Sequence, residues 1–254
     1  STNKLTAGAF VGDGSELTGI SAGFDPNVDI IKIGNGAGAT TQGSDGIAIG
    51  HDAGSSGTQG FNSVAIGAQA GRSTQGANAT AVGWLAGSQS QGDNSVAVGN
   101  QAGCSYQGSS AVAVGLNAGK NGQSGGGISM GYSAGCQSQG NWGIAIGGFS
   151  GSQGQGAFGV ALGVECGRQS QGSYAISIGN YAGEQNQGNN CIAIGYQAGR
   201  NSQPSNSFYI GTNSIRNRNG NYYCRYNSST GEIGYHSSDD RVKDDETFIT
   251  GAVK

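Results

Sequence analysis

Ser95-Val96-Ala97-Val98-Gly99 is one copy of the short pattern that decides the fold of this chain. The same order of small, aliphatic, small, aliphatic and glycine residues stands at 46–50 and 191–195, and it recurs for the last time near 207–211. Twelve copies follow one another from Ile30, spaced by 16 residues except for one step of 17. A period in this range is typical of solenoids, in which each repeat forms one turn of a stacked superhelix.

Each repeat has the character of short strands separated by tight turns. Its aliphatic, small, aliphatic triplet has a period of two, so the large side chains share one face of a strand and the small one lies on the other. Glycines such as Gly50 and Gly54 recur four residues apart, where positive φ or close backbone approach is expected. Several glycines per repeat and the lack of a 3.6-residue apolar stripe argue against helix. We therefore expect an all-β parallel β-roll, or β-solenoid, of about twelve 16-residue coils.

One polar position is as regular as the apolar ones. If coils stack at the spacing of β-strands, about 4.8 Å, the amides at this position lie one above the next and can hydrogen-bond along a structural ladder. The ladder consists of Gln42, Gln59, Gln75, Gln91, Gln107, Gln123, Gln139, Gln155, Gln171, Gln187 and Gln203.

A partner chain is expected, because one coil of this kind buries little apolar surface against a backbone entropy cost of about 1–2 kcal/mol per residue. The small residues at the strand centres, such as Ala48, Ala97 and Ser129, predict a flat second face that another copy can approach closely. We infer a homo-oligomer, with three-fold symmetry favoured. The pattern leaves open whether the aliphatic face packs within one chain or between chains.

Composition limits the classes of partner. The 254 residues include 52 glycines, only 11% are charged, and the net charge of −3 offers no basic surface to nucleic acid. No apolar run has the length of a membrane span, so membrane insertion is not expected. No metal-ligand spacing is present, and no cofactor or metal is expected.

The five cysteines do not form a disulfide framework. Cys104 and Cys136 share one position two coils apart, which separates their Cα atoms by about 9.6 Å, beyond disulfide reach. Cys166 and Cys191 replace small residues and are interpreted as packing residues. Cys224 is interpreted as a free thiol, although it could also meet its symmetry mates near an axis.

Composition changes along the chain predict four segments. Residues 1–29 are a turn-rich N-terminal linker, and 30–212 are the repeat array. Residues 213–237 contain the pattern of a β-hairpin, with Asn, Ser and Gly marking its turn. The charged stretch 238–254 forms the last segment.

The repeated Ser-Val-Ala-Val-Gly and Gly-Ile-Ala-Ile-Gly strands, each followed by Ala-Gly, resemble the head repeats of trimeric autotransporter adhesins, the YadA-like heads. The resemblance covers about 180 residues and implies a left-handed parallel β-roll in each chain of a homotrimer. Those heads usually have shorter repeats, and they lack the regular Gln-Gly found here.

Two further stretches resemble virus and phage fibres. Phe10-Val11-Gly12-Asp13-Gly14-Ser15-Glu16-Leu17-Thr18-Gly19-Ile20 is similar to a linker frequent in tail-fibre proteins. Ser238-Asp239-Asp240-Arg241-Val242-Lys243 resembles the opening of the intramolecular chaperone of endosialidase-type tail spikes, most of which would follow Lys254. That resemblance implies self-cleavage between Ser238 and Asp239, with Ser238 as nucleophile and Lys243 as its activating partner, when the full chaperone is present.

These features predict a structural attachment fibre on a virion surface, with an extracellular location and a host glycan or protein as receptor. Aromatic rings in variable positions suit sugar faces, and their alternative role is to cover coil edges or subunit contacts. The candidate contacts are Trp84, Tyr106, Tyr132, Phe149, Tyr181 and Tyr196. Trp142, Phe158 and Tyr174 share one position in successive coils and predict a stacked ladder rather than a ligand site.

Other classes of function remain as alternatives. A bacterial cell-surface adhesin would use the same solenoid, and a glycan- or ice-binding solenoid would need only one chain. An enzyme is not expected, because glycan-cleaving spikes use a pair of carboxylates in one cleft and no such pair can be recognised in this sequence. The acidic residues Asp45, Asp52, Asp93, Glu165 and Glu184 fall in different positions and coils, and neither His51 nor His236 has a catalytic partner at a readable spacing.

Overall fold

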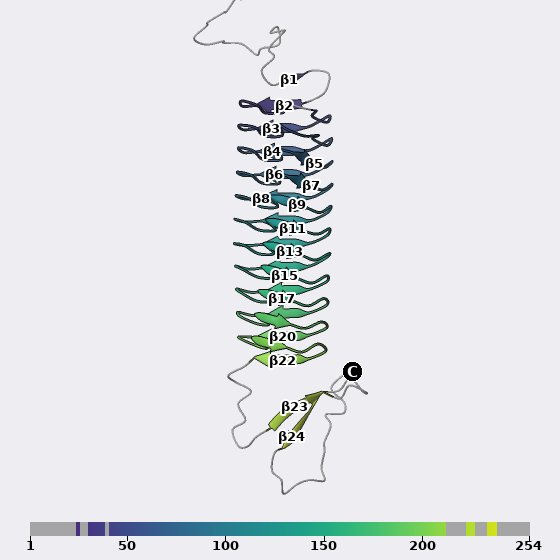
Figure 1. The fold of residues 1–254 in the computed structure, drawn as a ribbon, viewed down its shortest axis with the longest axis vertical. Coiled ribbons are helices and arrows are strands. Elements are labelled where there is room, and N and C mark those ends of the chain that lie inside the picture. The colour runs from purple at the N-terminus through teal and green to yellow at the C-terminus, as the bar shows by residue number, and fades with distance from the viewer. Residues whose placement is uncertain (1–23, 26–29, 39–40, 212–221, 227–232, 238–254) are drawn as a thin grey trace, which may run out of the picture. The chain divides into compact units, whose positions relative to one another are not determined.

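The computed structural model describes residues 24–25, 30–38, 41–211, 222–226 and 233–237. The chain forms two compact units, one ending at Gly211 and one beginning at Thr212. The first unit is a parallel β-solenoid of about eleven turns, and the described residues contain strands and turns but no helix (Figure 1). The all-β solenoid predicted from the repeat is therefore confirmed, while its handedness and its oligomeric state stay predictions.

One long sheet, sheet A, contains the aliphatic strands. It has 13 strands, of which β1 (Phe24–Asp25) pairs antiparallel with β2 and the rest are parallel. Each residue pairs with the residue one repeat later, as Val96 does with Val112. The parallel strands are β2 (Ile30–Ile33), β3 (Ile47–Ile49), β4 (Val64–Ile66), β6 (Thr80–Val82), β8 (Val96–Val98), β10 (Val112–Val114), β12 (Ile128–Met130), β14 (Ile144–Ile146), β16 (Val160–Leu162), β18 (Ile176–Ile178), β20 (Ile192–Gly195) and β22 (Phe208–Gly211).

A second sheet, sheet B, contains the glutamines and has nine strands. Isolated bridges from Gln42 to Gln59 and from Gln59 to Gln75 continue its pairing toward the N-terminus. Its strands are β5 (Thr74–Gln75), β7 (Ser90–Gln91), β9 (Ser105–Gln107), β11 (Asn121–Gln123), β13 (Gln137–Gln139), β15 (Gln153–Gln155), β17 (Gln169–Gln171), β19 (Gln185–Gln187) and β21 (Asn201–Gln203).

The central residue of each sheet A triplet points into the coil, and the two aliphatic residues point outward. Ala97 and Ser129 are 0% exposed, whereas Ile146 is 38% exposed. The expectation that the Ala/Ser face is open to another copy is therefore wrong. A 16-residue coil encloses a narrow space that must be filled at close-packed density, so small side chains fit inside and the larger aliphatic ones are excluded.

The glutamines of sheet B fill the rest of this space. Those from Gln59 to Gln203 are buried, and most donate Nε2 across the coil to a sheet A carbonyl, as Gln139 does to Ile128 at 2.9 Å. Direct amide-to-amide bonds also occur, for example from Gln139 to Gln155 at 3.0 Å. Where the strand centre is serine, as at Ser129, its hydroxyl donates to a glutamine Oε1. The predicted ladder is thus present, and its commonest bond crosses the coil rather than following the stack.

Two glycines per coil are required for different reasons. Gly99 has φ +126°, and a Cβ there would lie 2.7 Å from the carbonyl oxygen of Gly115 in the next coil. Gly103 has φ +52°, and a Cβ there would lie 2.7 Å from Oε1 of Gln107. The first glycine therefore permits the stacking of coils, and the second leaves room for the buried amide.

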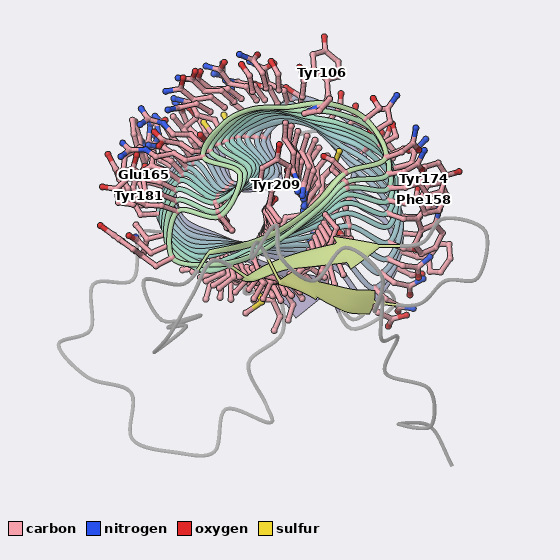
Figure 2. The ribbon with its side chains drawn as sticks, turned by 90° about the horizontal axis from the view of Figure 1, so that it is seen from below. Tyr106, Phe158, Glu165, Tyr174, Tyr181 and Tyr209 are labelled. Carbon is pink, nitrogen blue, oxygen red and sulfur yellow. The ribbon has the colours of Figure 1, made fainter. Side chains whose placement is uncertain are left out.

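The terminal strands of the solenoid differ from the inner ones. Lys32 and Tyr209 occupy the strand-centre position that holds alanine or serine in the other coils, and they pair with Ala48 and Ala193. Figure 2 shows Tyr209 within the outline of the coils when they are viewed along the stack. Larger residues at both ends are consistent with the need of repeat arrays for atypical capping repeats.

The second unit contains the β-hairpin expected from the sequence. Strand β23 (Tyr222–Tyr226) pairs antiparallel with β24 (Ile233–Ser237), and Cys224 lies opposite Tyr235. The linker-like stretch 10–20 and the residues Ser238, Asp239 and Lys243 lie outside the described residues.

Candidate receptor-contact surfaces

The outer side of sheet A is a continuous apolar surface, here named the aliphatic face. It is formed by the first and third residues of the sheet A strands from β3 to β20, all of them aliphatic or methionine except Thr80. Within the single chain these side chains are half-buried by their neighbours above and below. The most exposed, at 37–40%, are Ile66, Met130, Ile146, Ile178 and Ile194. A patch of this extent is larger than monomeric proteins normally leave in contact with water.

Five of the six candidate receptor contacts lie in the turn that follows sheet A, here named the Ala-Gly corner. Three of them directly follow a strand-closing glycine and are exposed: Trp84 (48%), Tyr132 (49%) and Tyr196 (58%). Phe149 and Tyr181 stand one position later, have positive φ and are half-buried. Sequence reasoning grouped these five with Tyr106 as aromatic residues in variable positions, and it did not separate the exposed rings from the half-buried ones.

Phe149 is held by contacts within the chain. Its ring meets Tyr132 edge to face, with centroids 4.8 Å apart. The guanidinium of Arg168 lies 5.6 Å from the Phe149 centroid and forms an ion pair of 2.6 Å with Glu165. Such cation–π and aromatic pairs stabilise the edge of the stack.

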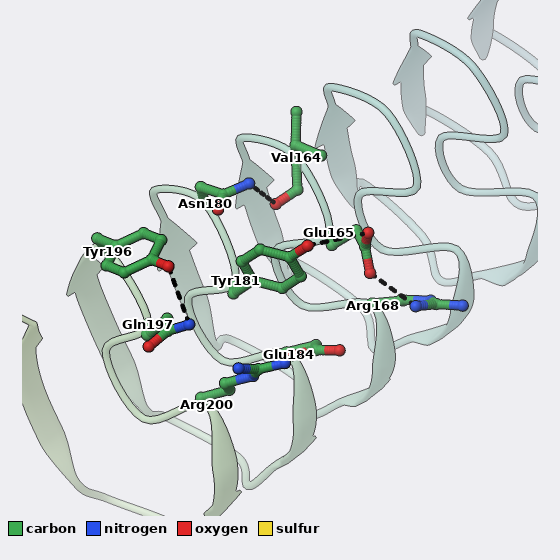
Figure 3. Close-up of polar contacts among 9 residues, drawn as sticks. All are labelled: Val164, Glu165, Arg168, Asn180, Tyr181, Glu184, Tyr196, Gln197 and Arg200. Atoms are coloured by element: carbon green, nitrogen blue, oxygen red, sulfur yellow. Dashed lines mark hydrogen bonds and ion pairs between the residues drawn. The ribbon is translucent and has the colours of Figure 1, made fainter.

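Tyr181 is the centre of a second set of contacts, drawn in Figure 3. The guanidinium of Arg200 lies 4.8 Å from its centroid, and the Tyr181 hydroxyl is 3.5 Å from Oε1 of Glu165. Arg200 donates to Glu184 at 2.6 Å, and the Glu184 side chain is only 6% exposed. This hydrogen bond raises the pKa of the Arg200 guanidinium. The alternative role weighed for the aromatics, covering coil edges, thus accounts for Phe149 and Tyr181.

Trp142, Phe158 and Tyr174 lie at the opposite corner, as Figure 2 shows for the last two. The rings of Phe158 and Tyr174 stack with centroids 5.0 Å apart and planes inclined by 10°, which confirms the predicted ladder at this step. The same position in other coils holds asparagines that bond to one another, such as Asn62 to Asn78 at 3.1 Å.

Tyr106 differs from the other five candidates, because it belongs to sheet B. It is 69% exposed and projects from the coil at a third place, away from both corners (Figure 2). A shallow, open depression surrounds it, here named the Tyr106 depression. Its lining consists of Ser90, Gln91, Gly92, Tyr106, Gln107, Gly108, Ser109, Gly122, Gln123 and Ser124.

The described acidic residues and His51 lie at the surface or in ion pairs. His51 Nδ1 lies 3.3 Å from Asp52 on the surface, and Glu165 and Glu184 are each paired with an arginine. Among the described residues, no three His, Cys, Asp or Glu side chains are grouped so that they could hold a metal ion.

The four cysteines of the solenoid have free thiols. Cys104 and Cys136 are not joined, and Cys166 and Cys191 are fully buried, as their interpretation as packing residues requires. Burial raises the pKa of the Cys166 thiol to about 12. Burial also raises the pKa of Cys136, and Lys120 opposes this effect.

Sequence reasoning missed the Arg–Glu pairs of the Ala-Gly corner and the depression beside Tyr106. The pairs join residues 3 and 16 positions apart, so writing the sequence in rows of one repeat would have placed Glu184 beside Arg200. The same alignment places Gly122 beside Tyr106 and predicts the gap next to the ring.

In the part of the chain that the structure describes, no helix is long and apolar enough to cross a membrane. The chain matches no protein-family model, and comparison with curated proteins and with solved structures gives no match.

Proposed function

We propose that this chain is the shaft of a homotrimeric attachment fibre, in which three solenoids pack through their aliphatic faces and present the opposite surfaces to a receptor. The observation that carries the proposal is the aliphatic face itself, which the single chain leaves partly in water. Burying the remaining exposed area would contribute roughly 1 kcal/mol for each aliphatic side chain. Because some twenty such side chains line one face, association would stabilise each chain by on the order of 10 kcal/mol.

Three-fold symmetry and a virion as the source rest on the resemblances of the repeat, of residues 10–20 and of residues 238–243. The proposed location is the virion surface, and the proposed receptor is a host-surface glycan or protein. We propose no enzymatic activity on a substrate. Self-cleavage between Ser238 and Asp239 is proposed only for a chain that carries the whole chaperone, where a Ser238→Ala variant would stay uncleaved by mass spectrometry.

Light scattering and small-angle X-ray scattering of the purified chain test the oligomer. We expect the mass of three chains, and we expect Ile146→Asp to reduce it to that of one chain, because three carboxylates would be buried at the interface. Gln153→Asp, a change at an exposed position on sheet B, is the matched control and should remain trimeric. A wild-type chain with the mass of a monomer would refute the trimer.

The main alternative, a bacterial cell-surface adhesin, uses the same solenoid in another setting. Antibodies against the solenoid should label fibres on virions in electron micrographs, whereas labelling of bacterial surfaces would favour the adhesin. Measurement of thermal hysteresis would test an ice-binding solenoid, and we expect none.

A further inference from the structure

We propose that the Tyr106 depression is the receptor-contact site of the solenoid and that its ligand is an uncharged saccharide. This inference rests on the attachment function proposed above and selects one of the six candidate aromatic residues. It identifies both the position of the binding site on sheet B and the chemical class of the ligand.

Among the described residues, no interaction gives the ring of Tyr106 a structural role. It is the most exposed of the candidate rings, and within the described residues its hydroxyl forms no hydrogen bond and its ring no aromatic contact. Phe149 and Tyr181, by contrast, are packed against arginines at the Ala-Gly corner. Tyr106 is therefore available to another molecule.

Tyr106 also occupies a backbone conformation that disfavours a large side chain. Its φ is +59°, and the same position in later coils holds residues that tolerate this region or fill little space, such as Gly122, Ser138 and Asn186. Positive φ recurs at regular turn positions of the solenoid, and other aromatic residues that adopt it, such as Phe149, are held by ring contacts within the chain. In the part of the chain that the structure describes, neither burial nor a ring contact offsets this conformational cost at Tyr106.

The coil after Tyr106 leaves space beside the ring. Gly122 has the same position in that coil, and a Cβ there would meet no atom closer than 3.9 Å. The glycine therefore has room around it instead of the close backbone contact seen at Gly99. An open ring beside an unfilled position gives a flat ligand a surface on which to stack.

The lining of the depression indicates a neutral, hydroxyl-rich ligand. It contains no charged side chain, and its partly or fully exposed polar groups include the hydroxyls of Ser90, Ser109 and Ser124. A pyranose combines an apolar C–H face, which suits an aromatic ring, with hydroxyls that exchange hydrogen bonds with serines. An acidic sugar would find no cation in this lining. A shallow site binds weakly, and three copies in one fibre would raise the avidity.

The test uses the full chain on a printed array of neutral and sialylated oligosaccharides. We expect binding to neutral members, and we expect Tyr106→Ser to weaken it about tenfold or more because the stacking surface is lost. Serine stands at this position in several other coils, so this change suits the repeat. Gly122→Asn should weaken binding similarly by filling the depression, while Gly154→Asn, the same change two coils away, should leave binding unaltered.

The outcomes separate this inference from the fibre itself. Binding only to sialylated members, no binding, or neutral binding that survives both Tyr106→Ser and Gly122→Asn would overturn the saccharide site. If light scattering of the same samples still gives three chains, the trimeric shaft would remain supported. Saccharide binding by a chain with the mass of one copy would instead overturn the trimer and leave the site in place.

Discussion

The inner and outer sides of sheet A reverse the usual relation between hydrophobicity and burial. The inner side holds alanine and serine at 0% exposure, beside a row of buried glutamine amides. The outer side holds isoleucine and valine, with Ile146 and Ile178 more than one-third exposed. In one strand, Ala145 is inside while the larger Ile144 and Ile146 are outside.

This difference shows that size, more than hydrophobicity, decides what enters a coil of 16 residues. The enclosed space is narrow, and the coil must also pair the carbonyls that face inward, which an amide can do and an isoleucine cannot. The aliphatic residues then become available for association between chains. Within one chain, such a solenoid is stabilised by hydrogen bonds and close backbone contact, while its apolar outer face stays partly exposed.

The largest effect is expected where a side chain would enter the stack itself. Gly147 has φ +122°, and a Cβ there would lie 2.5 Å from the carbonyl oxygen of Gly163. We expect Gly147→Ala to lower the free energy of unfolding by about 4 kcal/mol, because backbone strain adds to a backbone collision. Gly148→Ala is the matched control, since a Cβ at Gly148 meets nothing within 4 Å. Urea unfolding followed by circular dichroism measures both, and equal losses would contradict the stacking role.

The next effect compares a buried and an exposed glutamine of the same strand, β13. Gln139→Leu would remove the side-chain amide that donates to the carbonyls of Ile128 and Gly143, together with the bond to Gln155. We expect a loss of about 3 kcal/mol in the free energy of unfolding. Gln137→Leu, at an exposed position two residues earlier, should change it by less than about 0.5 kcal/mol. The comparison fails if thermal unfolding midpoints of the two variants coincide.

A smaller effect tests the volume available inside the coil. Ala145→Val adds two methyl groups to a fully buried position and should destabilise the chain by about 2 kcal/mol through overpacking. Ile144→Val, on the outer side of the same strand, removes one methylene and should cost about 0.5–1 kcal/mol. Stabilisation by Ala145→Val would show instead that the interior has unfilled space.

The last effect is absent at neutral pH and concerns the buried thiol of Cys166, whose pKa of about 12 lies above the ordinary value of 9.0. Between these values the unfolded chain loses the proton while the folded chain keeps it. Stability contributed by this group is therefore complete below about pH 9 and falls as the pH rises toward 12, by up to about 1.4 kcal/mol per pH unit. Cys166→Ala should remove this part of the alkaline slope in urea titrations, and an unchanged slope would exclude the thiol as its source.

Several features followed from local rules and could be predicted. The spacing of Gly99 and Gly103, the row of glutamines and the hairpin around Cys224 all depend on turn geometry and periodicity. The direction of each strand face could not be predicted, because a period of two distinguishes two faces without saying which is inside. For the same reason, the expectation that another copy approaches the Ala/Ser face was wrong.

The candidate site also has a part that could be predicted from the sequence and a part that could not. The sequence placed aromatic residues in variable positions, but it gave no reason to assign different roles to Phe149, Tyr181 and Tyr106. Their roles separate only when Arg168 and Arg200 are brought over two of the rings and Gly122 is placed beside the third. These neighbours lie 16 or 19 positions away in the sequence, and their contacts depend on how the coils stack.

The sequence by itself determined the class of fold, the length of the coil and the number of repeats, because glycine conformation and strand periodicity act over a few residues. Only the tertiary structure decided that the glutamines bond across the coil, that the aliphatic face points outward and that Tyr106 stands free. These outcomes depend on the volume enclosed by a closed coil and on the register of one coil upon the next, and both arise only when distant parts of the chain are packed together.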